Sequence, residues 1–245
     1  MQTINTRRSI RRYQDKDVDN TLLTRLIEEA ERTQTMGNLQ LYSVVVTRSK
    51  ELKAKLAPAH FNQPMVTGAP VVLTFCADYR RTTLWAENRK AHPGYDNILS
   101  FMNAATDALL FTQTFCNLAE EDGLGTCFLG TTVYMPQMII DTLKLPKLVM
   151  PVATITLGWP DEQPALSERL PLRSIIHQET FEDYTPEKID DFYAEKENLE
   201  VNKEFVRINH VETLAQVFTD IRYTKKDCET MSKGFLDALK NQGFL

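Results

Sequence analysis

The stretch Arg7-Arg-Ser-Ile-Arg-Arg-Tyr13 places four arginines within six positions of a chain whose net charge is −5. A guanidinium group presents a rigid fork of donors that matches a phosphate, and Ser9 adds a hydroxyl and a backbone N–H beside it. In an extended segment alternate side chains share a face, so Arg7, Ser9 and Arg11 would lie on one side. In the first turn of a helix this grouping would change, and free N–H groups would add to an anion site. The stretch therefore predicts phosphate binding, with a solvated basic N-terminus as the alternative.

The composition is that of an ordinary globular protein. Of the 245 residues, 42% are hydrophobic and 25% are charged, so the chain can form a core without disulfides. The negative net charge argues against a nucleic-acid surface over the whole protein, and we expect no nucleic-acid partner. A local basic pocket, such as the arginine stretch would form, is compatible with this charge.

The sequence gives no sign of a metal site or a membrane segment. The four cysteines and four histidines lack the spacings typical of zinc sites and disulfide frameworks: Cys76, Cys116, Cys127, Cys228, His60, His92, His177 and His210. Reduced, mostly buried thiols and no bound metal are the expectation. The first six residues lack the apolar region of a signal peptide, and no stretch reaches about eighteen uninterrupted apolar residues. We therefore expect a cytoplasmic protein without membrane contact.

Hydrophobic periodicity predicts strands interleaved with helices, which gives an α+β or α/β class. Strands are expected at residues 41–47, 71–76, 127–129 and 152–157, and helices at residues 18–32, 49–56, 97–122, 136–143, 186–197, 211–222 and 227–241. The proline-rich segment 58–70 is expected to be a loop, as is a long segment that starts at Gly158. Helix 97–122 is apolar on almost all sides, which is typical of a central helix that covers a buried strand.

The glycines between residues 123 and 130 do not form a dinucleotide-binding fingerprint. Their third glycine comes seven residues after the first, and the run follows a helix instead of a strand. Gly125 and Gly130 instead flank a short strand, where the backbone could approach a flat ring and donate N–H groups to it. The alternative is a helix C-cap followed by a bulged core strand.

Two further residues are candidates for ligand binding, but neither alone indicates a function. Gln63, between Asn62 and Pro64, could hydrogen-bond a heterocycle, although most loop glutamines are solvated. Arg169 lies in the long loop, and Pro171 stiffens its surroundings. No nucleophile elbow, Walker loop or zinc-protease helix motif is present, and no pair of carboxylates stands out as acid and base.

The order and spacing of these pieces resemble the FMN-dependent nitroreductase family, and within it the NADPH-preferring group of oxygen-insensitive nitroreductases and flavin reductases. Four motifs carry the resemblance: Arg7-Arg-Ser-Ile-Arg11, Gln63 ahead of the strand at residue 71, Gly123-Leu-Gly125 running to Phe128-Leu-Gly-Thr131, and Leu157-Gly-Trp-Pro160 leading to Arg169-Leu-Pro171. The match covers residues 4–180 well and continues more loosely to residues 236–244.

The resemblance implies a flavin site. Arg8, Ser9 and Arg11 would hold the FMN phosphate and ribityl end, and Arg169 would close on the phosphate. The Gln63 amide and the backbone from Leu129 to Thr131 would hydrogen-bond the isoalloxazine ring, and no side chain is assigned as catalytic. The full set of implied cofactor-binding residues is Arg7, Arg8, Ser9, Arg11, Gln63, Phe128, Leu129, Gly130, Thr131 and Arg169. Two positions depart from the family pattern, because Arg7 stands where histidine is more common and Ser167 where lysine is usual.

The resemblance also implies a fold and a partner. The fold would be an α+β sandwich, with a central mixed, mainly antiparallel sheet flanked by helices. One domain would span residues 1–245, with a core at 4–180 and a helical C-terminal extension at 185–245. Two copies would form an intertwined homodimer with the flavin sites at their interface, so part of the apolar surface of helix 97–122 would be interface.

The implied reaction is hydride transfer from NADPH, or NADH, through bound FMN to a small flat acceptor such as a nitroaromatic, a quinone or a flavin. Donor and acceptor would use one pocket in turn, which is a ping-pong mechanism. Lys203, Arg207 and Lys233 are candidates for contact with the 2′-phosphate of NADPH. The alternatives are a non-catalytic FMN-storage protein and a family member with another reductive activity such as dehalogenation.

Overall fold

The computed structural model describes residues 4–245. Residues 1–3, the first half of the N-terminal hexapeptide used above to argue against a signal peptide, lie outside the described residues. The chain divides into two compact units: the first runs up to Ala165 and also includes Met231–Leu245, and the second is Leu166–Thr230. The organisation as a single domain stays a prediction.

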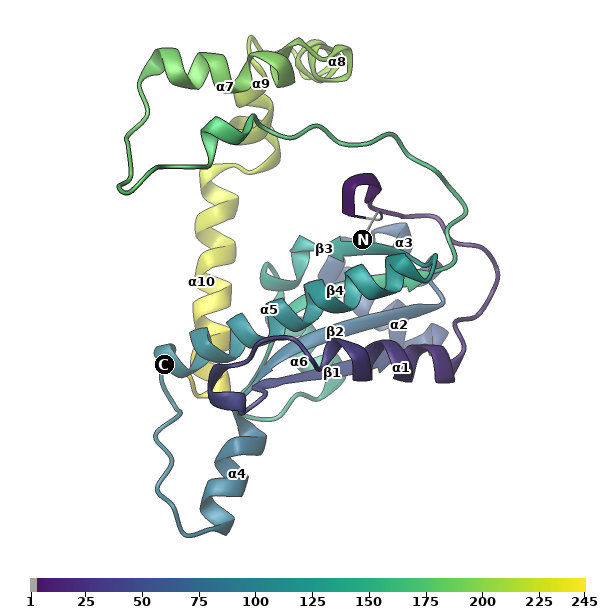
Figure 1. The fold of residues 1–245 in the computed structure, drawn as a ribbon, viewed down its shortest axis with the longest axis vertical. Coiled ribbons are helices and arrows are strands. Elements are labelled where there is room, and N and C mark those ends of the chain that lie inside the picture. The colour runs from purple at the N-terminus through teal and green to yellow at the C-terminus, as the bar shows by residue number, and fades with distance from the viewer. Residues whose placement is uncertain (1–3) are drawn as a thin grey trace. The chain divides into compact units, whose positions relative to one another are not determined.

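The first unit is built on a four-stranded antiparallel sheet (Figure 1). Its strands are β1 (Tyr42–Thr47), β2 (Val71–Asp78), β3 (Gly125–Leu129) and β4 (Val149–Gly158), in the order β1-β2-β4-β3. The strand β3 therefore lies at one edge of the sheet, beside β4. This arrangement confirms the predicted α+β class and the mainly antiparallel sheet.

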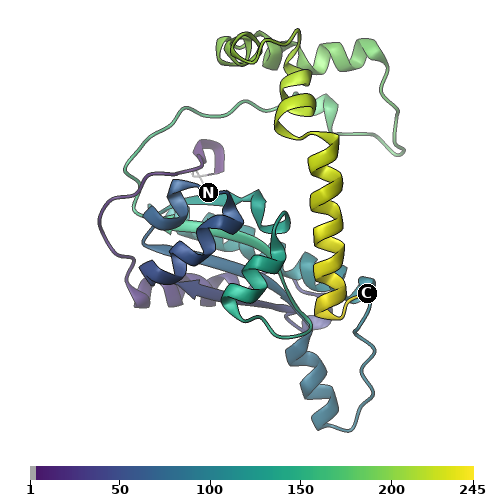
Figure 2. The same cartoon turned by 180° about the vertical axis from the view of Figure 1, so that it is seen from behind.

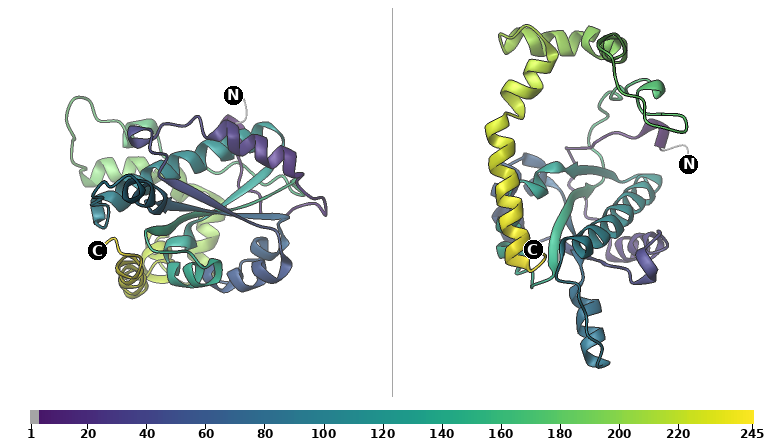
Figure 3. Two further views of the ribbon diagram at one scale, coloured as in Figure 1. Left: turned by 90° about the horizontal axis from the view of Figure 1, so that it is seen from below. Right: turned by 90° about the vertical axis from the view of Figure 1, so that its left-hand side faces the viewer.

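Helices cover both faces of this sheet. One face carries α1 (Asn20–Ala30) and α5 (Ile98–Glu121), and the other carries α2 (Lys50–Leu56) and α6 (Pro136–Leu143) (Figures 2 and 3). Every residue of β2 and β4 is buried as a result. This explains why both strands are almost continuously apolar in sequence, because a strand covered on both faces has no solvent side.

Capping residues set several of the predicted boundaries. The side chain of Ser49 accepts a hydrogen bond from the N–H of Leu52 at the start of α2, and that of Asn97 accepts from Ser100 at the start of α5. Gly123 follows the end of α5 with a φ of 81°, a conformation that favours glycine.

The long helix α5 has two different faces. Its rings Phe111 and Phe115 are buried against Phe75 of β2, with centroid separations of 5.6 and 5.9 Å. On the other side Leu99 and Met102 are 68% and 53% exposed. The apolar character on almost all sides therefore does not mean burial on all sides, because the sheet covers only one face.

Four segments differ from the sequence-based expectations. The expected loop at 58–70 holds a 3₁₀ turn, η3 (Ala57–His60), and a short helix, α3 (Pro64–Gly68), each with proline in its first turn, where its missing N–H costs no hydrogen bond. Two short polar helices, α4 (Arg80–Asn88) and α8 (Glu200–Ile208), had no prediction. The helix expected at 211–222 starts only at α9 (Leu214–Gln216), because Thr213 forms its capping box, and continues as the π-helix Val217–Arg222.

The second unit contains α7 (Pro186–Asn198), α8, α9 and the start of α10 (Lys225–Gln242). Its buried apolar side chains are Phe192, Leu214 and Val217, whereas Phe181 is 68% exposed. The C-terminal part of α10 belongs to the first unit, where Phe235 packs on Phe101 of α5.

Three properties of residues 4–245 bear on function. None of their helices combines the length and the hydropathy needed to cross a membrane. No three of their His, Cys, Asp and Glu side chains gather as metal ligands would. The cysteines are free thiols, buried at Cys76, Cys116 and Cys127 and exposed at Cys228, as predicted.

Candidate functional site

The arginine stretch is extended and runs beside the edge strand β3. Ser9 forms a parallel bridge with Thr126, and the N–H of Ile10 donates to the Thr126 carbonyl at 2.9 Å. The side chain of Ile10 lies so close to Gly125 that a Cβ at that position would be 2.7 Å away from it. Tyr13 ends the stretch by donating its hydroxyl to the Ile10 carbonyl at 2.6 Å. The sequence is compatible with either an extended segment or the first turn of a helix here, and the structure shows an extended segment.

Glu162 fastens the same stretch from the segment that follows β4. Its carboxylate accepts hydrogen bonds from the backbone N–H groups of Arg11 and Arg12 and, at 3.1 Å, from the Arg12 guanidinium. These hydrogen bonds, led by the one from the Arg11 N–H, lower the pKa of Glu162. The N–H of Asp161 donates to the Arg12 carbonyl at 3.0 Å. The arginine stretch is therefore held between β3 and residues 161–162.

The arginines of the stretch differ in their partners. Arg7 lies 3.8 Å from Glu120, a carboxyl whose pKa burial raises. Arg8 donates to two backbone carbonyls, those of Pro164 at 2.6 Å and Thr6 at 2.7 Å. Within residues 4–245, neither Arg8 nor Arg11 forms an ion pair with a carboxylate. Their positive charges are therefore available to an anion.

A groove of about 440 Å³ opens beside the first two arginines. Arg7, Arg8 and Ile10 line one part of it, and Glu120 and Gly125 line another. The groove therefore lies where the start of the arginine stretch meets the end of α5 and the start of β3.

The Gln63 turn presents a free amide. Phe61 and Asn62 both have a φ of 53°, which is costly for residues other than glycine and holds the chain in a tight reversal. The N–H of Gln63 then donates to the His60 carbonyl at 3.1 Å. Among the described residues, the Gln63 side-chain amide has no hydrogen-bond partner. It keeps its donors and its acceptor for a ligand.

The Phe128–Thr131 motif lies at the end of the edge strand. Phe128 is 52% exposed, whereas its neighbour Leu129 is buried in the core. Gly130 begins the 3₁₀ turn η4 (Gly130–Val133), and the Thr131 hydroxyl lies 2.8 Å from Nδ1 of His60. This contact joins η4 to the turn that carries Gln63. Three of the four sequence motifs therefore meet at β3.

The fourth motif is divided between the units: residues 157–160 belong to the first unit, where Gly158 pairs with Gly125 of β3, and residues 169–171 belong to the second. The Arg169 guanidinium donates to the backbone carbonyls of Ser167 at 3.2 Å and Glu168 at 2.8 Å. The role of Arg169 at the phosphate stays a prediction.

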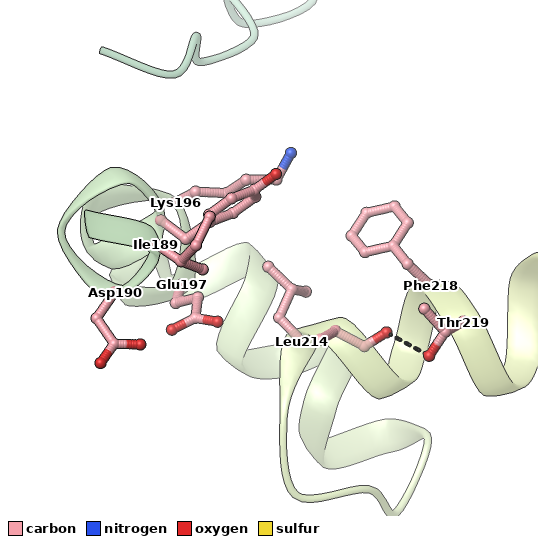
Figure 4. A pocket seen from close by; sticks show the side chains of 9 residues that line it. Ile189, Asp190, Lys196, Glu197, Leu214, Phe218 and Thr219 are labelled. Carbon is pink, nitrogen blue, oxygen red and sulfur yellow. Dashed lines mark hydrogen bonds between the residues drawn. The ribbon is translucent and has the colours of Figure 1, made fainter. Parts of the chain in front are cut away.

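A separate groove of about 540 Å³ lies within the second unit. Ile189 and Lys196 of α7 line one side of it, and Leu214 and Phe218 line the other (Figure 4). The Lys196 amine is 5.5 Å from the Phe218 ring centroid and 3.4 Å from the Glu168 carboxylate. None of the residues predicted to bind the cofactor lines this groove.

Sequence reasoning missed three residues that shape the site: His60, Glu120 and Glu162. His60 was set aside because the histidines are widely spaced in sequence, and the two glutamates because nothing distinguished them from other carboxylates. A signal for His60 existed, since it lies three residues before Gln63. The partners of Glu120 and Glu162 are distant in sequence and left no local pattern.

The donor set fits FMN. Guanidinium groups without carboxylate partners suit a phosphate, and a free amide suits the polar edge of a heterocycle. Arg11 also lies close enough to Cys127 to oppose the rise in thiol pKa that burial causes. Positive charge therefore reaches β3 itself. Arg8 and Arg11 would hold the phosphate, and Gln63 and the Phe128–Thr131 motif would contact the ring.

Comparisons with known proteins match the chain to one protein family. The Nitroreductase family matches residues 4–159. An FMN reductase [NAD(P)H] of Bacillus subtilis is 33% identical over 74% of each chain, and an oxygen-insensitive NADPH nitroreductase of Salmonella typhimurium is 28% identical over 71% of each. A crystal structure from Bacteroides fragilis, of an assumed oxidoreductase, has a TM-score of 0.98 and 58% identity over the whole of both chains. The NfrA1 nitroreductase of B. subtilis has a TM-score of 0.84 and 26% identity over 99% of this chain and 98% of that one. The family match, together with the motifs gathered at β3, identifies this chain as a member of the nitroreductase family.

Proposed function

We propose that this chain is an FMN-dependent NAD(P)H oxidoreductase that reduces small flat electrophiles such as nitroaromatics, quinones and free flavins. Its relatives include proteins named FMN reductase and oxygen-insensitive NADPH nitroreductase. The observation that carries the proposal is the meeting of three motifs at β3. There, arginines without carboxylate partners and a free Gln63 amide offer the donors that FMN needs.

When bound, FMN would supply the hydride chemistry, and the chain would bind and orient it. Arg8 and Arg11 neutralise the phosphate charge, and Ser9 adds a hydroxyl beside them. Gln63 and the backbone of the Thr131 turn hydrogen-bond the polar edge of the ring. No side chain of this site is assigned as an acid, base or nucleophile.

We expect ping-pong kinetics, because donor and acceptor would use the same exposed side of the site in turn. Initial rates measured with NADPH and a nitroaromatic at several fixed concentrations test this. Parallel double-reciprocal lines are the expected result. Intersecting lines would contradict a shared pocket.

The preference for NADPH over NADH is part of the proposal. Two candidates for contact with the 2′-phosphate have carboxylate partners on their own helix: Lys203 lies 3.3 Å from Glu200, and Arg207 lies 2.6 Å from Glu204. Lys233 on α10 is exposed and is the better candidate. We expect a higher kcat/KM for NADPH, reduced in Lys233→Ala. Equal values for both donors in the wild type would remove the preference.

We propose a homodimer because α5 leaves an apolar ridge in solvent. Leu99, Met102 and Leu109 are 68%, 53% and 44% exposed along one helix, and contiguous exposed apolar surface of this kind marks interfaces. Mass measurement in solution should give twice the mass of one chain, with FMN bound. A monomer that holds FMN stoichiometrically would contradict the dimer. The cytoplasmic location stays a prediction.

A further inference from the structure

His60 is a buried histidine that contacts both turns assigned to the flavin ring. Its side chain has no solvent exposure. Its carbonyl accepts the N–H of Gln63 at 3.1 Å, and its Nδ1 lies 2.8 Å from the Thr131 hydroxyl. One residue thus joins two segments that lie far apart in sequence.

The surroundings of His60 leave it little freedom. It ends the turn η3, which packs in a small apolar cluster with Leu129 and Ile139. The two residues after it, Phe61 and Asn62, both have positive φ values, so the chain reverses immediately. A shift of the imidazole would therefore move the Gln63 turn with it.

The hydrogen bonding of the ring indicates which nitrogen carries the proton. Nε2 of His60 is buried without a hydrogen-bond partner among the described residues. A buried N–H without a partner is rarer and costlier than a bare acceptor, so the proton belongs on Nδ1. Burial also lowers the pKa of His60 to about 4, so the ring is neutral at neutral pH.

This assignment has a consequence for Thr131. If Nδ1–H of His60 donates, the Thr131 oxygen accepts, and its own hydroxyl hydrogen stays free to donate. No acceptor for that hydrogen lies among residues 4–245. Thr131 is one of the residues that the family resemblance places at the flavin ring.

We propose that His60 is a positioning residue that fixes the Gln63 turn against the Thr131 turn and orients the Thr131 hydroxyl as a hydrogen-bond donor to the bound flavin ring. This role rests on the proposed function, since it concerns the same FMN site. It extends that function by adding a residue that does not touch the cofactor.

The experiment compares FMN affinity, by fluorescence titration of apoprotein, in variants matched in shape. His60→Leu and Thr131→Val remove one partner each. His60→Asn keeps a polar group near the position of Nδ1, and Thr131→Ser keeps the hydroxyl. Thr112→Val is the control, because Thr112 is also buried and its hydroxyl donates to the Ala108 carbonyl at 2.7 Å within α5.

We expect about tenfold weaker FMN binding in His60→Leu and in Thr131→Val, the loss of roughly one hydrogen bond. The double variant His60→Leu/Thr131→Val should bind FMN no more weakly than the single variants do, because each substitution already removes the contact between the two side chains. His60→Asn and Thr131→Ser should stay close to wild type. The visible absorption spectrum of bound flavin should change in Thr131→Val but not in Thr112→Val.

Two results would overturn the role of His60 and leave the proposed function standing. One is wild-type affinity in both His60→Leu and Thr131→Val, and the other is an equal loss of affinity in Thr131→Val and Thr112→Val. The second would mean that both act only through stability. If His60→Leu does not fold, the isosteric Thr131→Val still gives a decision. Absence of FMN binding by the wild type would instead overturn the proposed function.

Discussion

The two units of the chain are stabilised in different ways. In the first, β2 and β4 are buried along their whole length, and aromatic rings such as Phe75, Phe111 and Phe115 fill the space under α5. The second has few buried side chains and many ion pairs at the surface, such as Arg173–Asp191 and Lys188–Glu182. Exposed ion pairs contribute little, typically below about 1 kcal/mol each. The first unit therefore has a large apolar core of its own, whereas the second buries only three apolar side chains and leaves others, such as Phe181, exposed.

The largest expected effect separates the two units by one substitution made in each. Phe115→Ala should cost about 3–5 kcal/mol of unfolding free energy, because it leaves a cavity in the core, whereas Phe181→Ala, at a ring that is 68% exposed, should cost less than about 1 kcal/mol. Both tryptophans, Trp85 and Trp159, belong to the first unit. Urea unfolding followed by tryptophan fluorescence reports that unit, and far-ultraviolet circular dichroism reports both. Equal losses of unfolding free energy in the two variants would contradict this difference between the units and would mean that Phe181 is covered in the assembly.

A second prediction asks whether both units contribute to the phosphate site. Arg8→Ala in the first unit and Arg169→Ala in the second should each weaken FMN binding by about ten- to a hundredfold, the loss of roughly 1.5–3 kcal/mol of charge-assisted hydrogen bonding. Arg12→Ala is the control, since Arg12 pairs with Glu162. Fluorescence titration of apoprotein measures all three. An effect of Arg8→Ala alone would confine the phosphate site to the first unit.

The third prediction is a pH dependence that belongs to the first unit. Burial lowers the pKa of His60 from 6.5 to about 4, so protonation favours the unfolded state. Its contribution is fully present above pH 6.5 and is lost as the pH falls towards 4, by about 2 kcal/mol at pH 5. His60→Asn cannot titrate and should lack this part of the profile. Urea unfolding of both proteins between pH 7 and 5 measures it, and parallel profiles would show that folding does not lower the pKa of His60.

The smallest expected effect concerns a surface pair of the second unit. Arg207 and Glu204 are 2.6 Å apart on one turn of α8, with side chains that are 75% and 49% exposed. Arg207→Gln should leave the unfolding free energy almost unchanged, because the pair is exposed to solvent. Circular dichroism during urea unfolding, at low and high salt, is the check. A larger, salt-sensitive loss would indicate that this pair belongs to a network that helps hold the second unit.

Much of the fold could be predicted from local sequence patterns. The apolar runs of β2 and β4 and the caps Ser49 and Asn97 are local signals, and they placed strands and helix starts within a few residues. Short helices such as α3 could not be predicted, because so few residues carry no periodicity and their stability comes from packing.

The site was partly predictable for the same reason. Motifs marked the arginine stretch, Gln63 and Thr131, but no local pattern could indicate what holds them. His60 and Thr131 are 71 residues apart, and Glu162 is 151 residues from Arg11. Such partners become visible only when the chain is folded.

The most direct test of the account is anaerobic reduction of the purified protein by NADPH. The account predicts a yellow protein whose visible flavin absorption disappears on addition of about stoichiometric NADPH and returns when a nitroaromatic or quinone is added. That result would separate an enzyme from a protein that only stores FMN. Flavin that stays oxidised in the presence of both NADPH and NADH would contradict the account.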